Sequence, residues 1–243
     1  MSGSILVIDA GNSRIKWGTH DGNQWIKLSS LENSRAAELK SCFAQLPSVQ
    51  MVVVSNVAGE LLRGQLAAVL PANPTPRWIK SVSAQCGVRN GYADPAQLGC
   101  DRWAALIGAL RLAGGPALVV NAGTALTVDA LTAAGEFLGG IIVPGAELMC
   151  QALAAGTAAL RFQPGRFGRF PTATGDAILS GAIDAMCGAI ERMARFLDVA
   201  GQAAPRCVLS GGGAPLLAPH LNLEVKVVDN LVLEGLLVIA REG

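Results

Sequence analysis

Charged residues are scarce in this sequence, and their signs balance. They make up 15% of the 243 residues, with 19 Lys and Arg against 18 Asp and Glu. Binding to nucleic acid or to an anionic membrane relies on a general excess of positive charge, so neither kind of partner is supported. Hydrophobic residues, at 51%, are abundant enough to fill a substantial core. The composition therefore predicts a globular protein that recognises any partner locally.

A long apolar run and a paired-cysteine motif are also missing. No run reaches the roughly 18 residues needed to cross a bilayer, and the N-terminus lacks a basic segment followed by an apolar stretch and a cleavage site. We therefore expect a cytoplasmic protein. With no CxxC pair and only two histidines, a zinc site or a Cys/His nucleophile is disfavoured. Reduced, mostly buried thiols are expected at Cys42, Cys86, Cys100, Cys150, Cys187 and Cys207.

Hydrophobic periodicity and turn residues predict a similar order of elements in both halves. The first half is expected to contain strands over 5–9, 15–19 and 24–29, a helix over 34–46, the strand MVVVSNV, a helix over 59–70 and the strand RWIKSV. After Gly114 and Gly115 we expect strands over 117–121, 125–131 and 136–143, helices over 145–160 and 175–200, the strands CVLSGG and LEVKVVD, and a helix over 231–241. Residues 162–171 are expected to form a surface loop. The predicted domains are residues 1–115 and 116–243.

Each half opens with a buried strand that ends in a polar, glycine-containing turn. The first is ILVIDAGNSRIKW and the second is ALVVNAGTALTVD. Asp9 can hold a hydrated magnesium ion, and Gly11 lets the backbone approach an anion. Asn12, Ser13 and, in the second half, Thr124 can donate hydrogen bonds to phosphate oxygens. Ordinary hairpin turns use the same residue types for conformational reasons, so either turn by itself is weak evidence.

A third glycine cluster, SGGGA, follows another apolar strand and favours nucleotide binding. Gly211, Gly212 and Gly213 would let an adenine and ribose lie against the backbone, although a plain strand-to-helix turn also uses glycine. Neither GxxxxGK[ST] nor a strand-linked GxGxxG is present, which excludes the P-loop and Rossmann motifs.

The three turns resemble the phosphate-1, phosphate-2 and adenosine motifs of the superfamily that contains sugar kinases, acetate kinase, actin and the heat-shock chaperones. The resemblance implies an α/β fold of two duplicated ribonuclease-H-like domains, with mixed five-stranded sheets and ATP in a cleft between them. It assigns ATP and phosphate contacts to Asp9, Ala10, Gly11, Asn12, Ser13, Arg14, Ile15, Lys16, Thr124, Gly211 and Gly212. Strand alternation leaves open that Lys16 simply faces solvent.

The segment GYADPAQLGCDRWAALIGA narrows the resemblance. It is similar to the Y-x-x-P-x-x-L-G-x-D-R block of type III pantothenate kinases, also called the Bvg accessory factor family, and agrees at every fixed position from Tyr92 to Arg102. DAGNSRIKW, GTALTVD, GGIIVPG and TGDAILSG fall where that family has its other blocks. The resemblance covers essentially the whole chain. It implies ATP-dependent phosphorylation of pantothenate to 4′-phosphopantothenate, the first step of coenzyme A biosynthesis, by a homodimer with the pantothenate site near its interface.

The resemblance makes Asp101 the base that accepts the proton of the pantothenate hydroxyl. It assigns substrate contacts to Tyr92, Gly99, Cys100, Asp101, Arg102 and Thr174. The residues themselves also allow structural roles: Asp101 and Thr174 as helix N-caps, and Tyr92 as a core aromatic. Arg102 in a first helical turn would oppose the helix dipole, and a substrate carboxylate is a candidate partner for its guanidinium.

The implied cofactors are ATP, magnesium near Asp9, and a monovalent cation, potassium or ammonium. Many members of the family have aspartate where this chain has Asn121, and that aspartate is associated with the monovalent cation. Asparagine keeps an oxygen ligand and loses the negative charge, which puts the monovalent site in doubt. Two other functions stay open: a small sugar kinase of the same superfamily, and a non-catalytic ATP-binding regulatory or accessory protein. The sequence assigns no chemistry to Asp129, Glu147 or His220.

Overall fold

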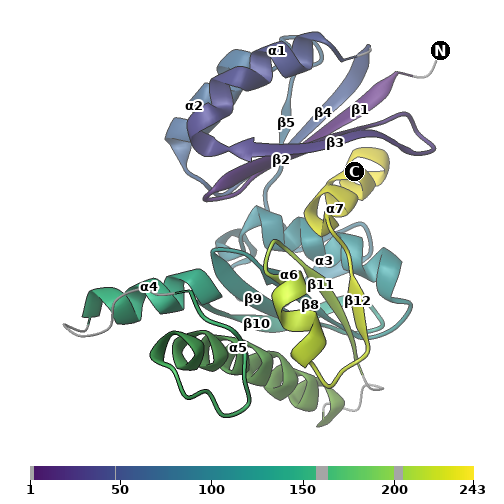
Figure 1. The fold of residues 1–243 in the computed structure, drawn as a ribbon. Helices are drawn as coiled ribbons and strands as arrows, with labels where there is room; N and C mark the ends of the chain where they lie inside the picture. The colour runs from purple at the N-terminus through teal and green to yellow at the C-terminus, as the bar shows by residue number, and fades with distance from the viewer. Residues whose placement is uncertain (1–2, 47, 157–163, 200–204) are drawn as a thin grey trace. The chain divides into compact units, whose positions relative to one another are not determined.

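The computed structural model describes residues 3–46, 48–156, 164–199 and 205–243, which form two compact units (Figure 1). The first unit comprises Met1–Leu112 and Leu231–Gly243, and the second comprises Ala113–Asn230. The sequence prediction placed residues 231–243 with the second half. The difference arises because the last helix, α7 (Leu231–Glu242), packs on strands of the first unit. The boundary predicted after residue 115 stays a prediction.

The first unit is built on a mixed five-stranded sheet in the order β3-β2-β1-β4-β5. Its strands are β1 (Ser4–Ala10), β2 (Arg14–His20), β3 (Trp25–Glu32), β4 (Val49–Asn56) and β5 (Arg77–Trp78). The first three form an antiparallel meander, while β4 runs parallel to β1 and β5 parallel to β4. The strand predicted for RWIKSV is therefore much shorter than expected, because only Arg77 and Trp78 pair with β4.

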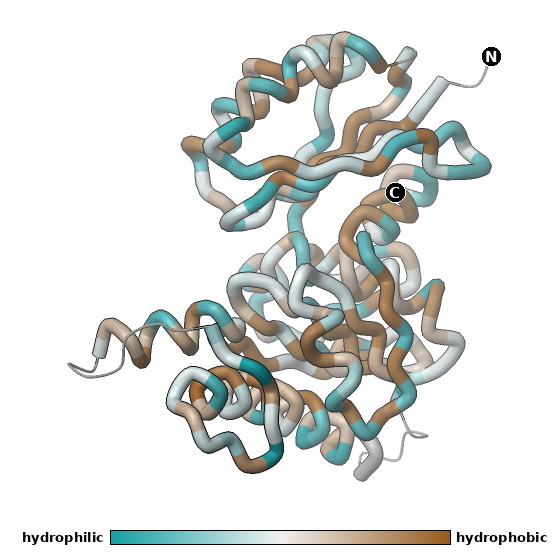
Figure 2. Tube along the Cα trace, viewed as in Figure 1, coloured by the Kyte–Doolittle hydropathy of each residue, from teal (hydrophilic) through white to brown (hydrophobic). Residues whose placement is uncertain are grey.

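Helices cover both faces of this sheet because its central strands are apolar on both sides. Leu6 and Ile8 belong to a buried cluster with residues of α1 (Leu39–Ala44) and α2 (Glu60–Val69). Val7, which alternates with them, is also fully buried, and α7 packs against β1, β2 and β4. The helix predicted over 34–46 is divided into a 3-10 helix, η1 (Asn33–Glu38), and α1. Hydrophobic residues are concentrated along the central strands and α7 (Figure 2).

The segment before the last helix of the first half contains elements that the sequence did not predict. Strands β6 (Ala84–Gln85) and β7 (Val88–Asn90) form a short antiparallel hairpin. A 3-10 helix, η2 (Pro95–Gln97), follows and leads into α3 (Cys100–Ala113). The Tyr92 to Arg102 block therefore spans a loop, η2 and the first turn of α3.

The second unit repeats the strand order of the first. Its five strands are β8 (Ala117–Ala122), β9 (Ala125–Leu131), β10 (Glu136–Pro144), β11 (Arg206–Ser210) and β12 (Val225–Val227). They belong to a seven-stranded sheet in the order β12-β11-β8-β9-β10-β7-β6, with β8–β9–β10 antiparallel and β11 and β12 parallel to β8. Thus β8 occupies the place that β1 has in the first unit. The duplicated α/β fold with mixed sheets is confirmed, and the first sheet has the five strands expected. The expectation of five strands is wrong for the second sheet, which has seven because the short strands β7 and β6, which have no sequence period, extend it beyond β10.

Helices α5 (Thr174–Val199) and α6 (Ala214–Leu217) cover one face of this second sheet. Helix α4 (Ala146–Gly156) packs against α5, and η3 (Ala218–His220) follows α6. The last four residues of the helix predicted over 145–160 lie outside the described residues. Residues 162 and 163 of the predicted loop also lie outside them. Residues 164–171 contain no helix or strand, as expected.

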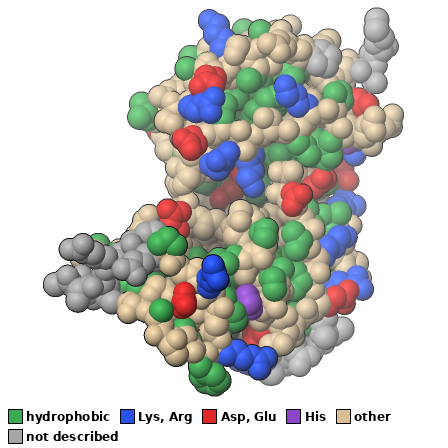
Figure 3. Space-filling view, in the orientation of Figure 1, with side chains coloured by type: hydrophobic (Ala, Val, Ile, Leu, Met, Phe, Trp, Pro, Cys, Tyr) green, Lys and Arg blue, Asp and Glu red, His purple; other side chains and the backbone are tan. Residues whose placement is uncertain are grey.

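The surface is mixed in charge: Lys and Arg are interspersed with Asp and Glu on the face seen in Figure 3. Among the described residues, no helix is both long and apolar enough to cross a membrane. All six cysteines are free thiols; Cys150, Cys187 and Cys207 are buried, and the other three are half-buried. No group of three or more His, Cys, Asp or Glu side chains in the described part of the chain is arranged to hold a metal ion.

Candidate active site

The carboxyl end of β1 places three polar side chains on one face of the first sheet. Asp9 is paired with Lys16 of β2 on one side and with Ser55 of β4 on the other. Paired residues on neighbouring strands project to the same face, so these side chains form a row across β2, β1 and β4. The sequence pointed to Asp9 and Lys16. It missed Ser55, whose polar side chain ends the apolar run MVVVS and is buried.

Asp9 lies in an environment that disfavours its negative charge. Its Oδ1 atom is buried and accepts no hydrogen bond. Burial, and secondarily the charge of Asp101, raise the pKa of Asp9 to about 7, against the opposing effects of Lys16 and of a hydrogen bond with Ser55. A cation beside Oδ1 would satisfy both the unpaired oxygen and the charge. Carboxylate and hydroxyl oxygens are the ligand types that magnesium prefers, so Asp9 and its surroundings fit a divalent cation.

Asp101 lies in the first turn of α3. The turn closes when the Trp103 N–H donates to the Gly99 carbonyl at 3.0 Å, and the Asp101 Oδ1 accepts the Arg102 N–H at 2.8 Å. A Cβ at Gly99 would lie 2.6 Å from that Oδ1, so the carboxylate occupies the space that a side chain would need. Burial raises the pKa of Asp101, while the Arg102 N–H and guanidinium oppose the shift. The carboxylate is thus a stronger proton acceptor than an exposed aspartate.

Arg102 and Tyr92 contact each other directly. Arg102, only 7% exposed, donates from Nη1 to the Tyr92 hydroxyl at 3.1 Å, and its guanidinium carbon lies 5.8 Å from the centre of the Tyr92 ring. The backbone of Tyr92 is fixed in turn, because its N–H donates to Asn90 Oδ1 at 3.0 Å. The block therefore assembles a guanidinium, a phenol and a carboxylate around the start of α3, which suits a substrate that carries both a hydroxyl and a carboxylate.

Cys100 completes the surroundings of this turn. Its Sγ lies 3.4 Å from Ser55 Oγ and 3.5 Å from the Asn56 carbonyl oxygen, to which it donates. Burial raises the pKa of this thiol, and the nearby aspartates add to the effect. A neutral, hydrogen-bonded thiol links α3 to β4 and is poorly suited to act as a nucleophile.

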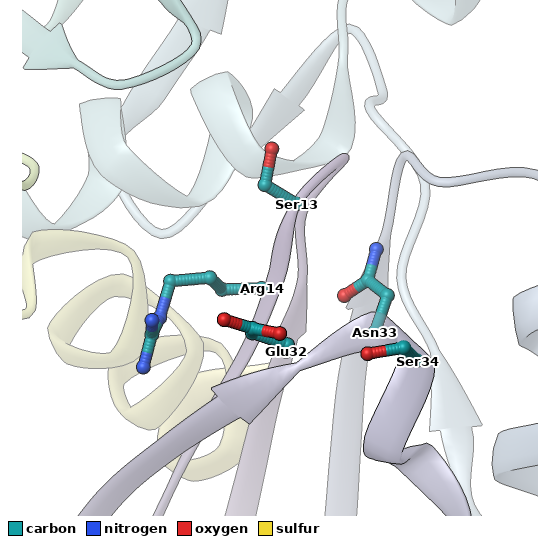
Figure 4. Close-up of a pocket in the computed structure, with 5 residues that line it drawn as sticks. All are labelled: Ser13, Arg14, Glu32, Asn33 and Ser34. Carbon is teal, nitrogen blue, oxygen red and sulfur yellow. The ribbon is translucent and has the colours of Figure 1, made fainter.

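The turn between β1 and β2 carries the predicted phosphate contacts. The Gly11 N–H donates to the Arg14 carbonyl at 3.1 Å, which closes the turn. The side chains of Ala10 and Ile15 are fully buried in the core, so any contact of theirs with phosphate is through the backbone. Beside the turn is a surface pocket of about 420 Å³, lined by Ser13, Arg14, Glu32, Asn33 and Ser34 (Figure 4). The sequence analysis missed Asn33, because this residue lies outside every motif that pointed to phosphate.

The second unit holds a corresponding set of residues at the end of β8. Asn121 is paired with Thr127 of β9 and with Ser210 of β11, which repeats the arrangement of Asp9, Lys16 and Ser55. Ser210 is buried, and the buried Oγ1 of Thr127 has no hydrogen-bond partner. Gly211 has φ +96°, and a Cβ there would lie 2.7 Å from Asn121 Oδ1, so only glycine fits.

The remaining predicted residues of the second unit lie in two places. The Gly145 N–H donates to the Thr124 carbonyl at 2.9 Å, and the Gly213 N–H donates to the Ala122 carbonyl at 2.9 Å, which brings the glycine cluster to the β8–β9 turn. Gly212 is exposed next to this contact. Thr174 is exposed at the first position of α5.

Comparison with known proteins gives a consistent set of relatives. A family profile described as type III pantothenate kinase matches residues 5–195. The type III pantothenate kinase of Nitrosospira multiformis is 49% identical over 243 residues, covering 100% of this chain and 93% of that protein. That of Aromatoleum aromaticum is 51% identical over 239 residues and covers 98% of each chain.

Solved structures agree on the fold at much lower identity. MreB5 of Spiroplasma citri, solved with bound ADP, is 11% identical and superposes with a TM-score of 0.54 over 99% of this chain and 97% of that one. At this level of identity the similarity concerns the fold. It matches the two duplicated units that the strand order defines.

Proposed function

The chain belongs to the type III pantothenate kinase family, which phosphorylates pantothenate in coenzyme A biosynthesis, and from this premise we propose how its own residues divide the reaction. The observation that carries the proposal is that two half-buried carboxylates of the first unit, Asp9 at the end of β1 and Asp101 at the start of α3, both have raised pKa values, and that the charge of Asp101 contributes to the shift of Asp9. In this proposal Asp101 accepts a proton and Asp9 faces a cation. A binding protein without chemistry would have no need of two carboxylates that are partly removed from water, because desolvating each of them is costly.

Asp101 acts as the base. The oxygen of the pantothenate primary hydroxyl forms a bond to the γ-phosphorus of ATP, the bond from that phosphorus to the β,γ-bridging oxygen breaks, and ADP leaves with the electron pair. The hydroxyl proton passes to the Asp101 carboxylate. Burial makes Asp101 more basic, and the Arg102 N–H at 2.8 Å fixes one of its oxygens, so the other is directed to the substrate.

Arg102 recognises the pantothenate carboxylate. Its guanidinium donates to the Tyr92 hydroxyl at 3.1 Å, which fixes the group beside the start of α3, and a guanidinium binds a carboxylate through two parallel hydrogen bonds. Gly99 and Cys100 shape the same turn, and Thr174 is assigned to the substrate by the family pattern.

Asp9 holds the divalent cation, for which we propose magnesium. When bound, that ion supplies positive charge to the phosphate oxygens. The backbone from Asp9 to Lys16 binds the phosphates. Lys16 is the cross-strand partner of Asp9, so its ammonium group lies on the same face of the sheet. The family pattern also assigns nucleotide contacts to Thr124, Gly211 and Gly212.

Three finer points belong to the same proposal. Asn121 Oδ1, Thr127 Oγ1 and Ser210 Oγ form a set of neutral oxygens that suits a monovalent cation, potassium or ammonium. A homodimer is supported by large apolar side chains that β10 and α4 expose: Leu138, Ile142, Leu148 and Leu153. A cytoplasmic location is supported by six free cysteines.

The test is a direct assay of the purified protein with ATP, magnesium and pantothenate, in potassium and in ammonium salts. Mass spectrometry should detect 4′-phosphopantothenate together with ADP in equal amounts. Formation of a hexose phosphate with no phosphopantothenate would instead indicate a sugar kinase. ATP binding without phosphoryl transfer to either acceptor, in every salt, would indicate a regulatory protein.

A further inference from the structure

Asn33 donates hydrogen bonds to three successive carbonyl groups in the turn between β1 and β2, the turn to which phosphate contacts are assigned. It follows β3 and begins η1. Its side-chain Nδ2 donates to the carbonyl oxygens of Gly11 and Asn12, each at 2.9 Å, and its backbone N–H donates to the Ser13 carbonyl at 3.2 Å. Figure 4 shows the amide nitrogen of Asn33 on the side of this turn and its oxygen on the side of Glu32 and Ser34. One residue therefore fixes the direction of three consecutive peptide groups.

The chemistry of the contact settles which way the amide points. Two carbonyl oxygens can be served only by the NH₂ group, since a flipped amide would place Oδ1 against both of them. In the observed orientation Oδ1 is buried and has no hydrogen-bond donor among the described residues. An unpartnered buried carbonyl is unfavourable for folding. Asn33 retains an unpartnered buried oxygen while its Nδ2 holds the turn. Such an arrangement is better explained by function than by stability.

The three carbonyl contacts determine where the amide N–H groups of the turn point. A trans peptide is planar, so its N–H points opposite to its C=O. The carbonyls of Gly11 and Asn12 face Asn33, and the N–H groups of Asn12 and Ser13 are therefore directed away from Asn33. Successive N–H groups directed to one side form an anion-binding concavity. The same contacts keep partially negative carbonyl oxygens away from that side.

We propose that Asn33 is a positioning residue for ATP: it orients the Gly11–Ser13 peptides so that their N–H groups face the phosphates. The inference rests on the proposed function and adds a residue outside the β1–β2 motif. The alternative is that Asn33 merely secures the end of the β2–β3 hairpin. The backbone already does so, because Arg14 pairs with Glu32 and the Asn33 N–H reaches Ser13, so the two Nδ2 bonds are additional to the hairpin.

The test compares Asn33→Ala and Asn33→Asp with Asn23→Ala. Asn23 is exposed in the turn at the other end of the same hairpin, and its side chain lies outside the proposed site. Asn33→Ala removes both Nδ2 donors and adds no charge, and Asn33→Asp places carboxylate oxygens against the two carbonyls. We expect the KM for ATP to rise roughly tenfold in Asn33→Ala and further in Asn33→Asp, with the KM for pantothenate changed less than about twofold. Equilibrium titration with ADP and magnesium should show the same order of affinities, and Asn23→Ala should match the wild type.

Thermal unfolding of the nucleotide-free protein separates positioning from a purely structural role. We expect the melting temperatures of Asn33→Ala and Asn23→Ala to agree within a few degrees. A wild-type KM for ATP and wild-type ADP affinity in both Asn33 variants would overturn the inference, as would equal rises in both KM values together with a large loss of stability. These results leave the proposed function intact, because the wild type would still make phosphopantothenate; a wild type that makes none would overturn the function itself.

Discussion

At the scale of single residues, the site depends on two carboxylates that are stabilised in different ways. Asp101 is half-buried, yet its Oδ1 accepts the Arg102 N–H and the missing side chain of Gly99 leaves room for it. Asp9 has the opposite arrangement, because its Oδ1 is buried without a donor and the charge of Asp101 acts on it. In the proposed function Asp101 is therefore already hydrogen-bonded in the free protein, whereas the unpaired oxygen of Asp9 is satisfied only when a cation binds. Substitutions at the two positions should have different consequences.

Asp101→Asn should lower kcat by at least about 10²-fold and leave the fold intact. The amide cannot accept the hydroxyl proton, and general-base catalysis typically contributes about 10²- to 10⁴-fold. Its Oδ1 still accepts the Arg102 N–H, so α3 keeps its first turn. Steady-state kinetics with pantothenate, and circular dichroism of the same preparations, provide the two measurements. Near-normal turnover in the variant would leave Asp101 with only a structural role at the start of α3.

Asp9→Asn should stabilise the metal-free protein at neutral pH and not at acidic pH. The folded pKa of about 7 lies above the ordinary aspartate pKa of 3.8, so the folded state binds more protons than the unfolded state between these pH values. Wild-type stability therefore falls as pH rises from about 4 to 7, and the asparagine variant lacks this loss. The difference should grow to the order of a few kcal/mol at pH 8.

Urea unfolding in the presence of a chelator, measured from pH 4 to pH 8, checks this prediction. Asp21→Asn is a control of opposite sign, since the N–H groups of Gln24 and Asn23 donate to the Asp21 carboxylate and lower its pKa. Removing the Asp21 carboxylate should therefore destabilise the folded protein more at neutral pH than at acidic pH. A stability difference between Asp9→Asn and the wild type that does not change with pH would refute the environment assigned to Asp9.

At the scale of secondary structure, periodicity predicted the long elements and missed the short ones. Strands β1 and β8 extend only one residue beyond each predicted end at most, because a continuous apolar run bounded by polar turns is a strong signal. The β6–β7 hairpin has strands of two and three residues, too few for any period. The strand predicted for RWIKSV is shorter than expected because its length depends on pairing with β4. The helix predicted over 34–46 begins as a 3-10 helix, which the sequence pattern alone did not indicate.

The candidate site was predictable to the same extent. The residues of the DAGNSR motif could be named because their types and spacing carry chemistry, and those of GCDR because the block resembles one of the pantothenate kinase family. Ser55 and Asn33 could not, because their roles come from the register of β4 against β1 and from the return of the chain after β3. Neither relation leaves a local pattern. Helix α7 was predicted as a helix, but its packing on the first unit required the tertiary structure.

Gly235→Ala should destabilise the first unit by about 1 to 3 kcal/mol, although alanine favours helix more than glycine does. A Cβ at Gly235 of α7 would lie 1.7 Å from the Ala104 carbonyl oxygen of α3, so the two helices would have to separate. Gly64→Ala is the matched control: Gly64 is exposed within α2 with nothing within 4 Å of its added Cβ, and alanine there should stabilise by up to about 1 kcal/mol. Denaturant unfolding of the two variants should give opposite signs, and an increase in stability for both would contradict the close packing of α3 and α7.

At the scale of the whole molecule, the two units share one topology but differ in charge at equivalent positions. Asp9, Lys16 and Ser55 form the row in the first unit, and Asn121, Thr127 and Ser210 form it in the second. The first row carries an acid and a base, whereas the second is neutral and includes the unpartnered Thr127 Oγ1. The first row suits a divalent cation and the second, at most, a weakly held monovalent one.

Asn121→Asp tests this division of charge between the halves. A carboxylate beside Thr127 and Ser210 attracts a monovalent cation more strongly than an amide oxygen does, so we expect activation by potassium in both proteins, with a half-saturating concentration severalfold lower in Asn121→Asp. Activity titrated with potassium chloride at constant ionic strength, balanced by a bulky organic cation, measures the difference. The melting temperature of the nucleotide-free protein across the same titration gives a readout independent of turnover. A wild-type half-saturation equal to or below that of Asn121→Asp would show that the charge at this position does not govern the cation, and turnover indifferent to potassium in both proteins would mean that the second row holds no cation.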